Sequence, residues 1–304
     1  MARQQKTPFW LHLGSFLVRI GLGIAFFWNG NDLLTPPLAI SRLESRLGNL
    51  VDIGLVTPST VHQVFQLIGH IEVAAGLLLI IGLFTRPAAI SLAGLLAIYL
   101  LRTGAHNLFE VKDAALLGAA LALALSGSGF VSLDGFLANW GLVKRMASPA
   151  PRWLALFGPT LLRLGLAVVF FWSGVHMMAD PRAFIQELSQ MQFIPNQPPF
   201  NQVDVLALVM WTGIAHVLAG TLLVLGFLTK PVAVIVCIFI GVLMTRLGVF
   251  TLPMVKDLAL AGAALSLAAA GPGALALDNA VRQLAGKVRK RRGPGRSAPG
   301  AVPG

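Results

Sequence analysis

The sequence predicts an all-α integral membrane protein, built from two four-helix transmembrane bundles in a parallel repeat, with eight spans in total. The composition is the first reason, because 56% of the 304 residues are hydrophobic and only 12% are charged, whereas soluble domains carry about 25% charged residues. The second reason is the length of the apolar stretches at 11–34, 64–84 and 207–228, each of which can cross a hydrocarbon core of about 30 Å. The third is an internal repeat.

The repeat appears when the chain is shifted against itself by 144 positions. Residues 19–134 and 163–278 then share 39 identities over 116 positions without a gap. Arg19-Ile-Gly-Leu aligns with Arg163-Leu-Gly-Leu, and Val111-Lys112-Asp113 aligns with Val255-Lys256-Asp257. Apolar composition alone would not bring charged residues into one register, so the chain contains a duplication.

Each copy is predicted to form four helices. Pro87 and Pro231 are well placed at the start of the third helices, and Gly127 and Gly271 are well placed to end the fourth. The predicted helices are 9–33, 62–84, 87–105 and 109–127 in copy one, and 154–178, 205–228, 231–249 and 253–270 in copy two. The predicted units are 9–140 and 154–284, joined by a cytoplasmic linker at 141–153 and followed by a basic, disordered tail at 285–304. A short amphipathic surface helix is also expected near 43–51.

The distribution of basic residues predicts the orientation. The net charge is +11, and Lys and Arg concentrate at the start of the chain, around 144–152 and in the tail. Such residues mark the cytoplasmic side of a membrane protein. We therefore expect a multi-pass protein of a bacterial inner membrane with both termini in the cytoplasm. Its expected partner is the lipid bilayer, and the basic tail is interpreted as an orientation signal with no nucleic-acid partner.

Polar residues inside the predicted helices are the candidate site, because ionisable groups in lipid are costly and need a reason to persist. Arg19 and Glu72 each lie about ten residues into a helix, so an ion pair between them at mid-depth is plausible. Lys112 and Asp113 point about 100° apart on a helix and do not simply pair with each other. We expect them to serve an interior site, in which Asp113 orients Lys112, or else to be an interfacial lysine and a helix cap. The candidates are Arg19, Asn29, Glu72, Arg102, Lys112 and Asp113, with the second-copy counterparts Arg163, Ser173, His216, Arg246, Lys256 and Asp257.

The charges of this set sum to +1 in copy one and +2 in copy two, if His216 is neutral. An unmatched cation in lipid would attract an anion or an electron-rich oxygen, such as a sulfur oxyanion, a lipid phosphate or a quinone carbonyl. His70 and Glu72 do not share a helix face, so no metal site is predicted. The single cysteine, Cys237, excludes a disulfide framework and is expected to be a packing residue.

The motifs resemble those of the DoxX family of small four-helix bacterial membrane proteins, here in tandem. The most telling segment runs from Glu72 through Gly76 and Gly82 to Thr85-Arg86-Pro87, and Lys112-Asp113 opens the fourth helix. The resemblance is to the DoxD/DoxX-type subunit of thiosulfate:quinone oxidoreductase, and it implies a redox-linked membrane subunit with quinone as a possible cofactor. It also implies a soluble redox or sulfur-transfer enzyme as a possible partner. Copy two departs from the pattern at His216 and Lys230.

The leading hypothesis is therefore a membrane subunit of a redox system that handles a quinone or a small sulfur oxyanion. Two alternatives remain open: a non-catalytic anchor or assembly factor for a partner enzyme, and a transporter of a small anion or lipid-like molecule. No catalytic residue can be assigned from the pattern, so enzyme activity stays an open question at this stage.

Overall fold

The fold is known from a computed structural model, which describes residues 9–35, 58–103, 108–129, 131–139, 157–190, 202–247 and 252–291. The regular elements within these ranges are all helices. The predicted surface helix near 43–51 and the linker at 141–153 lie outside the described residues. The side chains of Arg102 and Arg246 also lie outside the part of the chain that the structure describes.

The observed helices follow the repeat closely. Copy one contains α1 (Phe9–Leu34), α3 (Pro58–Ile81), α4 (Thr85–Thr103), α5 (Leu108–Ser126) and the short α6 (Leu133–Asn139). Copy two contains α8 (Phe157–Ala179), α9 (Pro181–Gln190), α10 (Gln202–Leu225), α11 (Thr229–Leu247), α12 (Leu252–Ala270) and α13 (Leu277–Arg291). The predicted all-α class is confirmed. Helix α13 continues through residues 285–291, where the sequence led us to expect a disordered tail.

Four of the described helices have the length and composition of membrane spans. Segments of α1, α3, α8 and α10 are long and apolar enough to cross a bilayer, and α4 and α11 carry shorter apolar segments. Helices α5 and α12 have 19 residues each, or about 28 Å at 1.5 Å per residue. The chain is thus a multi-pass membrane protein, and the apolar side chains on its outer faces match a lipid environment.

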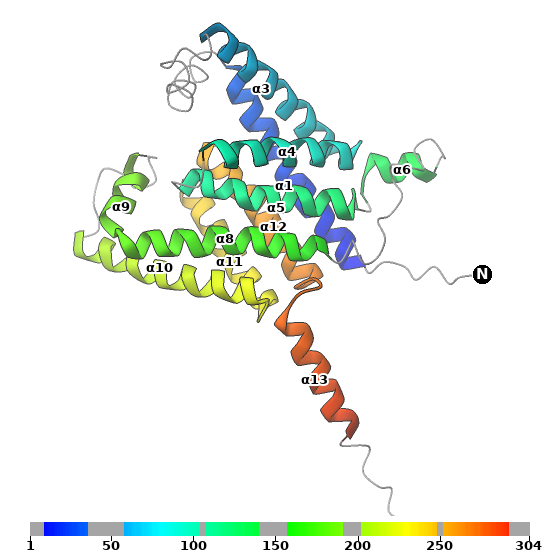
Figure 1. Cartoon of the computed structure of the whole chain (residues 1–304), viewed down its shortest axis with the longest axis vertical. Coiled ribbons are helices and arrows are strands. Elements are labelled where there is room, and N and C mark those ends of the chain that lie inside the picture. The colour runs from blue at the N-terminus through cyan, green and yellow to red at the C-terminus, as the bar shows by residue number, and fades with distance from the viewer. Residues whose placement is uncertain are drawn as a thin grey trace, which may run out of the picture.

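The eight long helices form two crossing layers, and each layer takes two helices from each copy. In the first layer α3 packs on α1, α1 on α12, and α12 on α11. In the second layer α4 packs on α5, α5 on α8, and α8 on α10 (Figure 1). The 144-residue repeat maps one layer onto the other. The two copies are therefore interleaved, and one continuous apolar core contains residues of both.

Glycines allow the close packing at the contacts between copies. A Cβ on Gly262 of α12 would meet the Leu17 carbonyl oxygen of α1 at 2.7 Å. The repeat-related Gly118 of α5 faces the Leu161 carbonyl oxygen of α8 at 2.6 Å. Small residues at helix contacts let backbones approach in membranes, where lipid tails remove the usual hydrophobic drive for helix association. The two contacts between copies are thus built in the same way.

A duplicated turn closes one end of the structure. Between α3 and α4 the chain passes through Gly82 (φ 71°) and Phe84 (φ 50°), a conformation that costs energy for a residue with a side chain. The Asp134 carboxylate accepts hydrogen bonds from the Phe84 and Thr85 N–H groups at 2.8 and 2.9 Å. Asp278 does the same for Leu228 and Thr229 at 2.9 and 3.0 Å. Helix α6, the start of α13 and the beginning of α1 all lie at this end, while α9 lies at the other (Figure 1).

Candidate functional site

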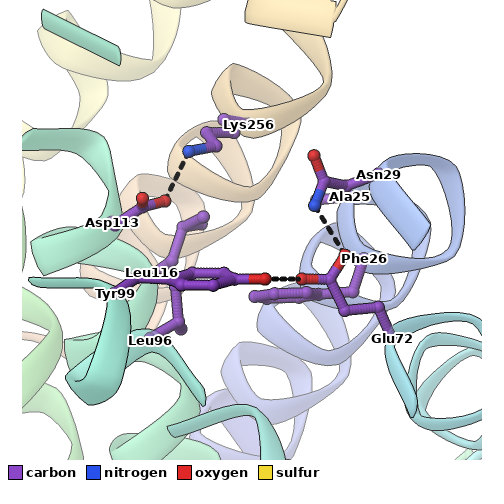
Figure 2. Close-up of a pocket in the computed structure, with 9 residues that line it drawn as sticks. All are labelled: Ala25, Phe26, Asn29, Glu72, Leu96, Tyr99, Asp113, Leu116 and Lys256. Carbon is purple, nitrogen blue, oxygen red and sulfur yellow. Dashed lines mark hydrogen bonds and ion pairs between the residues drawn. The ribbon is translucent and has the colours of Figure 1, made fainter. Parts of the chain in front are cut away.

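A small pocket lies between the two layers and is lined by residues of both copies (Figure 2). Helices α1 and α3 of copy one line one side of it, α4 and α5 line another, and α12 of copy two completes it. Its free volume is about 20 Å³, enough for about one water molecule. The lining residues are Ala25, Phe26, Asn29, Glu72, Leu96, Tyr99, Asp113, Leu116 and Lys256.

Glu72 is the centre of this pocket, and its residue is 0% exposed. One carboxylate oxygen accepts a hydrogen bond from the Asn29 side-chain amide at 2.5 Å, and the other accepts one from the Tyr99 hydroxyl at 3.2 Å. Figure 2 shows both donors pointing at the carboxylate from different helices. Its direct hydrogen-bond partners in the described structure are therefore both neutral groups.

The Lys-Asp motifs form two ion pairs, and each pair joins one copy to the other. Lys112 lies 2.8 Å from Asp257, and Lys256 lies 2.5 Å from Asp113. All four residues are buried. The prediction that Asp113 orients Lys112 is wrong, because adjacent residues on a helix diverge and each finds its partner on the facing helix of the other copy. The Lys256–Asp113 pair lines the pocket (Figure 2).

Arg19 does not pair with Glu72, so this prediction is wrong as well. The guanidinium of Arg19 donates hydrogen bonds to the carbonyl oxygens of Ser128, at 2.9 Å, and Val131. It also interacts electrostatically with Asp134. Arg163 repeats this arrangement with the carbonyls of Pro272 and Leu275 and with Asp278. The arginines thus stabilise the duplicated turn, and the chain segment that follows α5 folds back to reach them.

This pairing reverses the charge argument made from the sequence. The sum of +1 and +2 left out Asp134 and Asp278, which lie near the two arginines, and the four Lys and Asp residues neutralise one another. Glu72 has neutral hydrogen-bond donors, and the pocket around it carries a second acid, Asp113, and one base, Lys256, which are paired with each other. This balance does not favour an anionic ligand, because an anion would be repelled by acidic groups that are ionised.

The corresponding region of copy two has a different composition. Glu72, Asn29 and Tyr99 are replaced by His216, Ser173 and Leu243. The His216 ring stacks on Phe170, with 4.9 Å between ring centroids, and meets Phe239 edge-on at 5.0 Å. Its Nδ1 pairs with the Thr212 carbonyl oxygen of its own helix at 2.7 Å. Aromatic packing therefore fills the place that the polar group of Glu72 occupies in copy one.

Tyr99 is the residue of this site that the sequence analysis missed. A signal existed, because it is the single tyrosine of the whole chain and lies in an otherwise apolar helix. In the described part of the chain, no group of three or more His, Cys, Asp or Glu side chains could hold a metal ion. Gly76 and Gly220 serve helix packing, since a Cβ on either would meet the backbone nitrogen of Phe27 or Phe171 at 2.5 Å.

Comparison with known proteins finds one family and finds it twice. The DoxX family model matches residues 14–105 and residues 158–253. The two matched segments include the first three long helices of each copy, and together they cover more than half of the chain. No curated protein and no solved structure matches the chain.

Proposed function

The chain belongs to the DoxX family, whose membrane proteins are often redox-linked, and we propose that it binds a quinone at the copy-one pocket as part of a redox system. The observation that supports this proposal is the buried Glu72 carboxyl with its neutral donors Asn29 and Tyr99, beside the Lys256 ammonium. A quinone is neutral and dissolves in the bilayer, and it carries oxygens that accept hydrogen bonds. Each of these properties suits a polar pocket among apolar helices.

The charges of the pocket favour this ligand over a sulfur oxyanion. Glu72, Asp113 and Lys256 line it with two acids and one base. An oxyanion would face the carboxyl groups of Glu72 and Asp113, and the one lysine is already paired with Asp113 at 2.5 Å. A neutral carbonyl oxygen would instead take the place of the water for which the pocket has room. Because the pocket has room for only about one water, the quinone ring would enter only if the buried side chains of Phe26, Leu96 and Leu116 moved apart.

The residues also suit the protons that accompany quinone reduction. Conversion of a quinone to a quinol takes up two electrons and two protons. We propose that the electrons come from a donor in a partner enzyme, and that Glu72 and Tyr99 hold and pass protons to the quinone oxygens. Proton transfer needs a donor within about 2.6–3.2 Å of the acceptor, or one water away. The Tyr99 hydroxyl and the Glu72 carboxyl face the same small space (Figure 2).

We propose further that the end carrying α6 and α13 faces the cytoplasm of a bacterial inner membrane, which puts the pocket nearer the outer surface. The basic residues at the chain ends and around 144–152 support this orientation. Reporter fusions after Gly129 and after Gly271 should both give cytoplasmic signals. A periplasmic signal at either point would contradict the orientation.

The duplication supplies a matched pair of variants for testing the ligand. Lys256→Met and Lys112→Met each break an equivalent buried ion pair between copies, but only Lys256 lines the pocket. Full-length protein in nanodiscs is titrated with a short-chain quinone analogue, and binding is followed by calorimetry. Wild type and Lys112→Met should bind, whereas Lys256→Met should lose binding although both variants lose similar thermal stability.

The remaining outcomes reject the proposal in different ways. Equal loss of binding in both lysine variants would show that the pocket is not the site. No binding by the wild type, together with binding of thiosulfate or sulfite, would favour an oxyanion carrier. No ligand at all, with a stable co-purifying enzyme, would favour an anchor or assembly factor.

A further inference from the structure

Helix α13 differs from every other long helix of the chain in composition. Its apolar residues Leu277, Val281 and Leu284 recur at intervals of four and three, which places them on one face of a helix. These side chains are 45%, 51% and 61% exposed. Basic residues are concentrated in the second half of the helix, and Arg282 is exposed as well. The basic residues of the helix are Arg282 in its first half and Lys287, Arg289, Lys290 and Arg291 in its second half.

The position of α13 is fixed at its first turn. Only residues 271–276 separate it from the membrane helix α12. Asp278 then ties it to the start of α11: its carboxylate accepts from the N–H groups of Leu228 and Thr229, and its own N–H donates to the Gly226 carbonyl oxygen at 3.0 Å. Helix α11 carries an apolar segment and packs on α12 within the body of the protein, so we place the start of α13 at the bilayer surface. Beyond this turn it leaves the body of the molecule (Figure 1).

Helix α6 of copy one shows that the aspartate contacts at the first turn do not require a basic helix. Helix α6 starts in the same way, with Asp134 on the N–H groups of Phe84 and Thr85. It has only seven residues, ends at Asn139, and contains no Lys or Arg. Helix α6 also exposes the apolar side chains Leu133 and Phe136, so α13 differs from the described α6 in its greater length and its positive charge.

We propose that α13 is a membrane-surface helix that binds anionic phospholipids of the leaflet beside it. Its apolar face would enter the headgroup region, and its basic residues would contact phosphate groups. A helix with one apolar face and a basic opposite face is typical of this location. Charge complementarity favours lipid over a second copy of the chain, because two such helices would each bring five basic residues to the contact.

The experiment uses the full-length chain in nanodiscs with a Cys237→Ser background, since Cys237 is the single native cysteine. A polarity-sensitive fluorophore is placed at Val281→Cys on the apolar face, or at Arg282→Cys, about 100° further round the helix. In discs containing phosphatidylglycerol, iodide should quench the Val281 probe much less than the Arg282 probe. In discs of phosphatidylcholine alone the two probes should be quenched alike.

Charge removal and salt give the second readout. Changing Lys287, Arg289 and Lys290 together to Gln should shift the docking equilibrium by about 100-fold, or about fivefold for each charge. High salt should act in the same direction, since it shortens the screening length to about 3 Å at 1 M. Equal quenching of both probes in anionic discs would overturn the proposal. The proposal would also be overturned if the Val281 probe were protected from quenching equally in anionic and neutral discs. Protection that occurs only with two chains in one disc, or only after another protein is added, would overturn it as well.

Discussion

The two copies share a scaffold but differ in the pocket it encloses. Around Glu72 the structure holds a carboxyl, an amide and a phenol beside a small space. At the equivalent place in copy two, a histidine ring lies between Phe170 and Phe239. Everything that builds the scaffold is retained in both copies: the Lys-Asp pairs, the arginines on the turn, and the aspartates that cap it. The comparison separates the residues that make the fold from those available for a ligand.

The largest losses of stability are expected at the Lys-Asp ion pairs, to which both copies contribute equally. Removing one partner of a buried pair costs about 3–5 kcal/mol, because the other charge is left buried alone. Lys112→Met and Asp257→Asn should therefore each destabilise strongly, and the double variant should lose much less than their sum. A double-mutant cycle on thermal unfolding in detergent measures the coupling, which is about 0.5–3 kcal/mol for contacting residues.

The control for this cycle is the pair of sequence neighbours Lys112→Met and Asp113→Asn. These residues belong to different ion pairs, so their coupling should be the smaller one. Stronger coupling between the neighbours than between Lys112 and Asp257 would mean that the pairs do not cross between the copies.

A second prediction compares the caps, where the copies are alike. Asp134→Ala and Asp278→Ala each leave two N–H groups without an acceptor at a strained turn. Loss of a helix cap costs about 0.5–2 kcal/mol, and we expect values near the upper end for both. The losses of unfolding free energy in the two variants should agree within about 0.5 kcal/mol, which is the usual effect of a surface substitution away from special features. A clear difference between the two losses of stability would show that the turn contributes differently to stability in the two copies.

The third prediction separates ligand binding from stability. Glu72→Gln should abolish binding of the quinone analogue and cost only about 1 kcal/mol, the value of a typical hydrogen bond, since no ion pair is broken. His216→Gln should leave binding intact and lose the ring contacts with Phe170 and Phe239, worth about 0.5–1.5 kcal/mol each. Binding isotherms and unfolding curves for the same samples test this. Equal effects on binding would remove the functional difference between the copies.

The smallest effect is expected at Tyr99. Tyr99→Phe keeps the ring and removes one hydroxyl, so stability should fall by about 0.5–1.5 kcal/mol. Binding of the analogue should weaken by about tenfold, which corresponds to 1.4 kcal/mol. Leu243→Phe at the same position of copy two is the matched control and should leave binding unchanged. Unaltered binding in Tyr99→Phe would exclude a contact between the hydroxyl and the ligand.

The sequence predicted the elements well because the signals were local or repeated. Pro87 and Pro231 lie near the observed starts of the third long helices at Thr85 and Thr229, and Gly127 and Gly271 follow the fourth. The repeat also aligned Glu72 with His216, and left open whether both copies retain a site. Sequence spacing within a helix says which residues share a face, but it does not say which helix that face meets.

Apart from the helical residues 285–291, where a disordered tail was expected, the failures concern contacts between distant segments. Arg19 was placed with Glu72 because the two have similar depth, yet its carbonyl partners lie more than a hundred residues along the chain. The Lys112–Asp257 pair spans 145 residues. The sequence shows Asp134 and Asp278 only as matching positions of the repeat. Each caps a turn about fifty residues earlier in the chain, and such a contact leaves no periodic pattern in the sequence. Tyr99 carries no charge, so the cost of burying ionisable groups in lipid does not mark it as a site residue.

The interleaving of the copies has a consequence for how the protein is made. Helix α1 packs on α12, and its Gly21 faces a helix whose Gly262 is synthesised about 240 residues later, which at 5–20 residues per second is roughly 12–48 s. During that interval the glycine-lined side of α1 lacks its neighbour α12. Helix α5 likewise lacks its neighbour α8 until that helix has been made. A first half released into the bilayer early would expose two unfilled surfaces, each suited to the equivalent surface of another nascent chain. Until the second half has been inserted, the first half therefore lacks the partners that its contact surfaces require.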